Sequence, residues 1–98
     1  MLKDTVKTAL RLGTAAAEAL SDEIDRNIKT ARAEMVRVGV SVDVAESGNE
    51  LVENAIVTFC LMNLSDSSSY ERYRESWLYQ LDNLRKSNIT VERSDPDV

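Results

Sequence analysis

Histidine is absent from this 98-residue sequence, and cysteine, phenylalanine, tryptophan and proline each occur once. With no histidine and a single thiol, Cys60, the usual zinc sites and Cys–His catalytic pairs are excluded. A lone cysteine also excludes an internal disulfide, so nothing indicates an oxidising compartment. We therefore expect no metal, no cofactor and no catalytic residue, which is to say a protein that is not an enzyme.

Long apolar runs and an excess of basic charge are missing as well. The longest apolar stretch, 55–62, contains Thr58 and is far too short to cross a bilayer. Lys3, Asp4 and Lys7 interrupt the first residues, which does not fit a signal peptide. Twelve basic against seventeen acidic side chains give a net charge of −5, which argues against binding to nucleic acid through its phosphates. We expect no membrane partner, no sequence-specific DNA binding and synthesis in the cytosol.

What the sequence does contain fits one small domain. A chain of this length supports one hydrophobic core and not two. Hydrophobic residues at 43% and charged residues at 30% are typical of a folded protein. We predict a single helical domain at 1–91. Residues 92–98 have no apolar periodicity and contain Pro96, so we predict a disordered acidic tail there.

Two helices are predicted in the first half of the chain, where apolar residues recur every three or four positions. The first is short and ends near Gly13. The second begins at Ser21, a good N-cap residue, and stops before Gly39. Acidic side chains at 22–25 suit the positive end of its helix dipole, so they do not indicate a catalytic carboxylate pair. Its apolar stripe is formed by Ile24, Ile28, Ala31, Met35 and Val38.

The segment 36–44 has valine at every second position, which is the periodicity of a strand. Because Gly39 divides this pattern from the preceding helix, we predict a short extended segment at about 40–44. A strand needs a hydrogen-bonding partner, and 89–91 is the other β-branched run. The two segments could pair within one chain or between two chains, and the sequence leaves both alternatives open. The residues predicted for this interface are Val40, Val42, Ile89 and Val91.

The next predicted helix runs from Glu50 to about Asn63, with Asn49 as its cap. Its apolar residues surround it almost completely, as in a helix that is buried on all sides. A central core helix covered by its own chain is one reading. Full burial in so small a domain is difficult, however, so we also predict that Val57 and Leu61 contact another subunit.

The last predicted helix begins at the capping-box pair Ser68 and Glu71 and runs to about Lys86. Tyr79 lies opposite its apolar stripe, and aromatic residues are enriched where protein partners bind. We therefore predict Tyr79 as a further interface residue. The fold expected overall is mainly α: a compact bundle of three to four helices, with the extended segment and a flexible C-terminal tail.

Four segments, taken in order, carry a resemblance to a known family. They are a short basic helix at 1–12, the acidic helix start Asp-Glu-Ile-Asp-Arg-Asn-Ile at 22–28, a central helix at 52–59, and Tyr-Glu-Arg-Tyr-Arg-Glu-Ser-Trp-Leu at 70–78. The chain resembles the head–tail connector, or head-completion adaptor, family of tailed bacteriophages over residues 1–86. It departs from that pattern in the alanine-rich stretch 14–20 and in the strong valine alternation.

The resemblance implies a virion structural protein that is made in the bacterial host cytoplasm and resides at the head–tail interface. Its partners would be further copies of itself, about twelve in a ring under the portal, together with the portal protein and a tail or stopper protein. DNA would pass through the ring without sequence-specific binding. The family's use of C-terminal segments to contact the portal transfers to 89–98. The alternative hypothesis is a small acidic helical regulatory protein that binds a partner protein.

Overall fold

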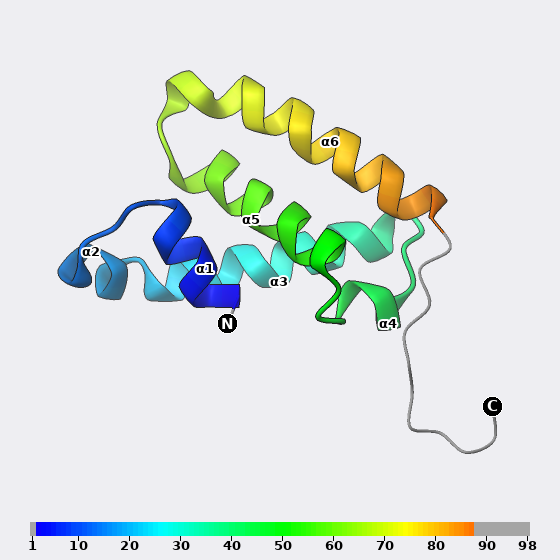
Figure 1. The fold of residues 1–98 in the computed structure, drawn as a ribbon, viewed down its shortest axis with the longest axis horizontal. Coiled ribbons are helices and arrows are strands. Elements are labelled where there is room, and N and C mark those ends of the chain that lie inside the picture. Colours follow the sequence, from blue (N-terminus) through cyan, green and yellow to red (C-terminus); the bar gives the residue numbers. More distant parts are fainter. Residues whose placement is uncertain (1, 88–98) are drawn as a thin grey trace, which may run out of the picture.

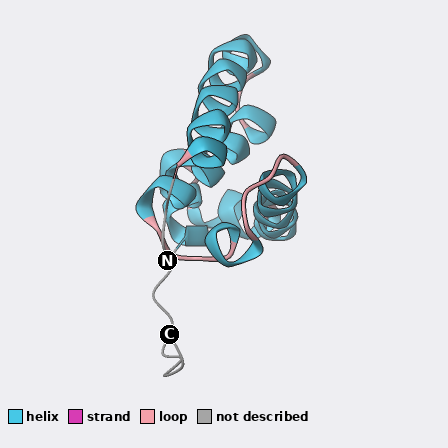
Figure 2. Cartoon of the chain, turned by 90° about the vertical axis from the view of Figure 1, so that its right-hand side faces the viewer, coloured by secondary structure: helices cyan, strands magenta, loops and turns pink. Residues whose placement is uncertain are grey.

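The structure is a computed structural model, and it describes residues 2–87. Six α-helices and one 3₁₀ turn, η1, make up this part of the chain, and none of its residues lies in a strand (Figure 2). The predicted mainly α fold is therefore confirmed. In chain order the elements are α1 (Leu2–Ala9), α2 (Thr14–Ala19), α3 (Ser21–Arg37), α4 (Val42–Ala45), α5 (Glu50–Leu64), η1 (Ser67–Ser69) and α6 (Tyr70–Lys86).

Helix α5 lies at the centre of the fold. It forms an antiparallel hairpin with α6 on one side and packs against α3 and α1 on the other (Figure 1). This position explains why its apolar residues point in several directions, and it confirms the reading of a central core helix. The buried residues of α5 are Val52, Ala55, Ile56, Phe59, Cys60 and Met62.

The remaining core residues come from every other α-helix except α2, and from Val40 in the turn between α3 and α4. Helix α1 contributes one buried residue, Val6, and the Phe59 ring of α5 meets the Trp77 ring of α6 edge to face at 4.8 Å between centroids. Such a pair adds about 0.5–1.5 kcal/mol to what burial alone contributes. The residues buried outside α5 are Val6, Ile24, Ala31, Met35, Val40, Val44, Ala45, Trp77, Leu81 and Leu84.

The predicted extended segment at 40–44 is wrong. Ser41 is the N-cap of the short helix α4, and its side-chain oxygen accepts a hydrogen bond from the Val44 backbone N–H at 3.2 Å. Val40 and Val44, four residues apart, are both buried, whereas Val42 points outward. A strand at this position would need a neighbouring strand to satisfy its backbone, and none lies within residues 2–87. Local capping therefore decides the conformation.

The end of α3 explains why the chain reverses at this point. The Val40 N–H bonds to the Met35 carbonyl at 2.9 Å, and the Gly39 N–H bonds to the Val36 carbonyl at 3.1 Å. These two bonds form a Schellman motif, in which the residue just after the helix adopts a positive φ. Gly39 has φ +112°, a conformation that L side chains rarely adopt.

Helix α1 ends in the same motif without a glycine. The Leu12 N–H bonds to the Lys7 carbonyl at 3.3 Å, and the Arg11 N–H bonds to the Thr8 carbonyl at 3.0 Å. Arg11 consequently has φ +57°, in the left-handed region that costs a non-glycine residue about 1–2 kcal/mol. The packing of Leu10 and Leu12 against the edge of the core, which this turn makes possible, offsets that cost.

Replacing Gly39 by alanine is expected to lower the free energy of unfolding by about 1–2 kcal/mol. The added Cβ would meet only the Arg85 Cγ, at an ordinary 3.7 Å, so the cost would come from the backbone and not from a clash. Urea denaturation followed by circular dichroism measures this change. Gly13→Ala is the matched control, since Gly13 has φ −72° and its Cβ would meet no atom within 4 Å. Equal effects of the two substitutions would contradict the explanation.

Of the three predicted capping residues at helix starts, one is confirmed and two are wrong. Asn49 caps α5 as predicted, since its side-chain oxygen accepts from the Leu51 N–H at 2.8 Å. Ser21 does not cap α3, because α2 leads directly into it and Leu20 occupies the cap position. The capping box at Ser68 is also wrong. That residue lies in η1, and no side chain caps α6.

Two ion pairs tie the shorter helices to α3. The Lys3 ammonium of α1 meets the Asp25 carboxylate at 2.9 Å. The Arg32 guanidinium of α3 donates to the Ala45 carbonyl at the end of α4 at 2.5 Å and pairs with Glu46 at 3.5 Å. The Arg32 contacts satisfy a C-terminal carbonyl of α4, which would otherwise lack a helical partner.

Candidate protein–protein interface

A groove runs between α3 and α4 on one side of the molecule. We call it the α3–α4 groove. It has a volume of about 350 Å³, and it is lined by Lys29, Arg32, Ala33, Val36, Val42, Ala45 and Glu46. Its lining combines apolar side chains with basic and acidic ones. Such a combination is typical of a protein-binding surface.

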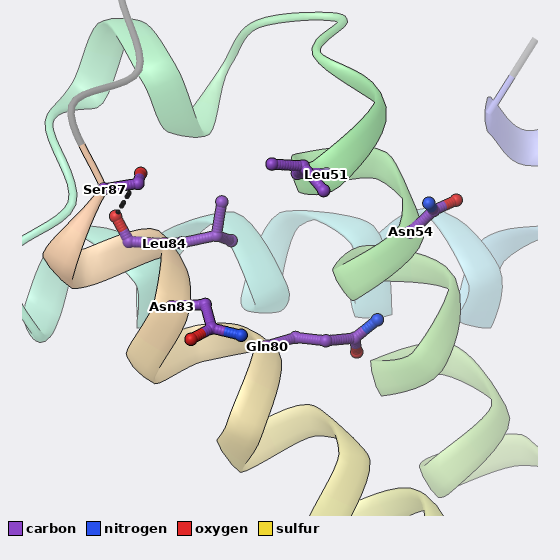
Figure 3. Close-up of a pocket in the computed structure, with 6 residues that line it drawn as sticks. All are labelled: Leu51, Asn54, Gln80, Asn83, Leu84 and Ser87. Carbon is purple, nitrogen blue, oxygen red and sulfur yellow. Dashed lines mark hydrogen bonds between the residues drawn. The ribbon is translucent and has the colours of Figure 1, made fainter.

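A second groove of about 330 Å³ lies between the start of α5 and the end of α6 (Figure 3). We call it the α5–α6 groove. Leu51 and Leu84 form its apolar part, and the Ser87 side chain closes one end, where its hydroxyl donates to the Leu84 carbonyl at 3.0 Å. The remaining lining residues are uncharged amides: Asn54, Gln80 and Asn83.

Of the five predicted interface residues that the structure describes, Val42 and Tyr79 are the most exposed. The Val42 side chain is 60% exposed and lines the α3–α4 groove together with Val36. Tyr79 is 70% exposed on the outer face of α6. The structure therefore leaves both side chains open to a partner, and their contact with one stays a prediction.

The surroundings of Tyr79 are charged and not apolar. One α-helical turn further along α6, the Asp82 carboxylate accepts a hydrogen bond from Arg85 at 2.8 Å and pairs with Lys86 at 2.9 Å. These donors lower the pKa of Asp82 below its ordinary value. Tyr79 thus lies one helical turn from an ion-paired carboxylate, whereas Val42 shares its groove with the apolar residues Ala33, Val36 and Ala45. The α3–α4 groove is the better candidate for the centre of an interface.

The other predicted interface residues lie elsewhere. Val40 is only 5% exposed because it packs into the chain's own core. Val57 and Leu61 are half-buried on α5, with Val57 against the core and Leu61 beside a polar hollow next to α1. Ile89 and Val91 lie outside the described residues, as does the predicted tail at 92–98. The structure therefore does not bring the predicted set together in one surface.

Sequence reasoning missed Leu51 and Leu78. Leu51 is 59% exposed in the first turn of α5, where it lines the α5–α6 groove beside Leu84 of α6. Leu78, at the margin of the α6 stripe, is also exposed.

Reactive groups do not gather anywhere in residues 2–87. Burial raises the pKa of the Cys60 thiol to about 12, so it stays protonated and shielded. No group of three or more acidic or thiol side chains in this part of the chain could hold a metal ion. Among the same residues, no helix has both the length and the apolar character to cross a membrane.

In comparisons with known proteins, no protein family matches this chain, and neither a curated protein nor a solved structure matches it. Its function is therefore inferred from its own residues and their arrangement.

Proposed function

We propose that this chain is a structural assembly protein: an adaptor that joins head and tail in the virion of a tailed bacteriophage or prophage. In this role several copies form a ring under the portal protein, extend the DNA channel and present a surface to a tail or stopper protein. The bonds it makes are between protein surfaces, and no chemical step is assigned to it.

The observation that carries the proposal is apolar surface left exposed on a domain whose core is already complete. Val36 and Val42 line the α3–α4 groove, and Leu51 lines the α5–α6 groove. Exposed apolar side chains next to polar and charged ones are the combination found in protein contacts. Two grooves on different elements suit a subunit that contacts more than one neighbour, as a heterologous ring contact requires.

The order of the helices supports the same proposal. The segments that carry the resemblance to phage connectors fall on α1, α3, α5 and α6, so each lies on a helix as that family's pattern implies. The alanine-rich departure at 14–20 forms the extra helix α2, and the valine alternation ends in α4. Both departures therefore add a short helix without interrupting the four main segments.

The charge of the chain supports a channel function. A net charge of −5 gives little attraction to the phosphate backbone of DNA. A protein through which DNA must slide benefits from weak binding, since contacts to phosphates would hold the duplex in place.

The proposal is tested by measuring mass with light scattering over a range of protein concentrations, alone and with the portal protein encoded by the same phage or prophage. We expect a ring or a complex with portal protein. Val42→Asp should abolish that association, because it places a charge among the apolar residues that line the α3–α4 groove. Circular dichroism should show that the variant keeps its helices, since Val42 is mostly exposed.

Ala15→Asp is the control, because Ala15 is an exposed residue of α2 outside both grooves. It should assemble like the unmodified protein. The proposal fails if the protein is a monomer or dimer at every concentration and does not associate with portal protein. Tight binding to some other, basic partner would then favour the regulatory alternative.

A further inference from the structure

Helix α1 is held on the rest of the molecule by one apolar stripe and one ion pair. Val6 is fully buried, and Leu2 and Leu10, four residues to either side, pack partly buried against the same core. The Lys3 ammonium meets the Asp25 carboxylate of α3 at 2.9 Å. The surface that α1 covers on α3 and α5 is therefore specific for the sequence of α1 itself.

The connection that follows α1 is short and strained. Only residues 10–13 join α1 to α2, and Arg11 among them has φ +57°, in the left-handed region that is unfavourable for an L side chain. The two backbone hydrogen bonds of the Schellman motif impose this angle. Opening the connection would release Arg11 from it. A short, strained hinge favours exchange of the element that it holds between two copies of a chain.

Helix α2 does not fix α1 in place. None of the residues of α2 is buried, and it lies at one end of the molecule, beyond the packed helices (Figure 1). If the hinge opened, Leu10 would move with α1 because it precedes Arg11, whereas Leu12 follows Arg11 and would stay with its own core. The contacts of α1 would thus be remade on a neighbouring copy, without the strain at Arg11.

We propose that two copies of this chain associate by exchanging α1. The α1 of each copy occupies the site on α3 and α5 of the other, where its Val6 fills the same buried position and its Lys3 pairs with Asp25. Reciprocal exchange gives a dimer with two-fold symmetry. This inference is independent of the proposed function, because such a dimer needs neither the two grooves nor the portal protein.

Cross-linking without a spacer tests the exchange. A carbodiimide joins an ammonium and a carboxylate that are already in contact, as Lys3 and Asp25 are at 2.9 Å. Full-length protein labelled with ¹⁴N and with ¹⁵N is mixed in urea, refolded at high concentration, cross-linked and separated by size. Mass spectrometry then shows whether the two residues of a cross-link come from one molecule or from two. We expect cross-links between the two labels in the dimer fraction and none in the monomer fraction.

Two substitutions of Arg11 change the strain in opposite directions and remove the same charge. Glycine adopts a positive φ readily, so Arg11→Gly should raise the Kd of the dimer about 5–30-fold per hinge. Valine is β-branched and tolerates that φ less well than arginine, so Arg11→Val should lower the Kd. Analytical ultracentrifugation measures both values. A change of Kd in the same direction for both variants would contradict the role of strain.

Two results would overturn the proposal. One is a protein that stays monomeric after refolding at every concentration, with Arg11→Val doing the same. The other is a dimer in which every cross-link between Lys3 and Asp25 lies within one molecule, which would show that the copies associate through another surface. Arg11 is exposed, and Arg11→Gly relieves strain in the monomer, so that variant should fold.

Discussion

Replacing Phe59 by alanine is expected to lower the free energy of unfolding by about 3–5 kcal/mol, as truncating a buried aromatic ring typically does. Phe59 is 8% exposed and meets the Trp77 ring edge to face, so the substitution removes both buried area and this ring contact. A domain of this length has a total stability of only about 5–15 kcal/mol. The variant should therefore unfold at a far lower urea concentration than the unmodified protein.

The fluorescence of Trp77, the single tryptophan, reports this loss directly. Tyr79→Ala is the control, because it also truncates an aromatic ring next to the hairpin but at a site that is 70% exposed. Its effect should stay within about 0.5 kcal/mol, as for most surface substitutions. If both variants lost similar amounts of stability, α5 and α6 would not pack through the Phe59–Trp77 contact.

Replacing Val6 by aspartate should detach α1 from the rest of the fold. Val6 is fully buried and is the one buried residue of α1. Burying an unpaired carboxylate destabilises the fold by more than the packing of α1 stabilises it. Each large apolar side chain contributes only about 1.5–3 kcal/mol when it is buried. The helix is therefore expected to leave its site, and the loss of stability should be limited to about 3–5 kcal/mol.

Hydrogen exchange resolved by residue distinguishes local detachment from global unfolding. Amides of residues 2–9 should lose protection in the variant, while those of α5 and α6 keep it. Thr8→Asp introduces the same charge at an exposed position of α1 and should leave the protection of that helix unchanged. Loss of protection throughout the chain would show that α1 is needed for the rest of the domain to fold.

The α3–α4 and α5–α6 grooves differ in their chemistry. The first combines apolar side chains with Lys29, Arg32 and Glu46. Arg32 is already engaged there, because it pairs with Glu46 at 3.5 Å and donates to the Ala45 carbonyl. The lining of the second carries no charged side chain.

The valines of 36–44 show how far a local pattern can be interpreted. Alternation predicted a strand, yet Val40, in the turn before α4, and Val44, within α4, are buried, while Val36 and Val42 line the α3–α4 groove. Gly39 and Ser41 decide the conformation of this segment. The Schellman turn at Gly39 and the N-cap at Ser41 satisfy the backbone hydrogen bonds locally. A strand would have needed a second strand as its partner.

The sequence by itself determined the mainly helical fold and the position of the three long helices, because apolar spacing and residues such as Asn49 and Gly39 act within a few positions. Only the tertiary structure decided which apolar residues stay exposed. Phe59 and Leu51 are both apolar residues of α5, but Phe59 is buried against Trp77 of α6, whereas Leu51 stays 59% exposed in the α5–α6 groove. Exposure depends on how closely a neighbouring helix packs at each position, and that is set by contacts between distant segments.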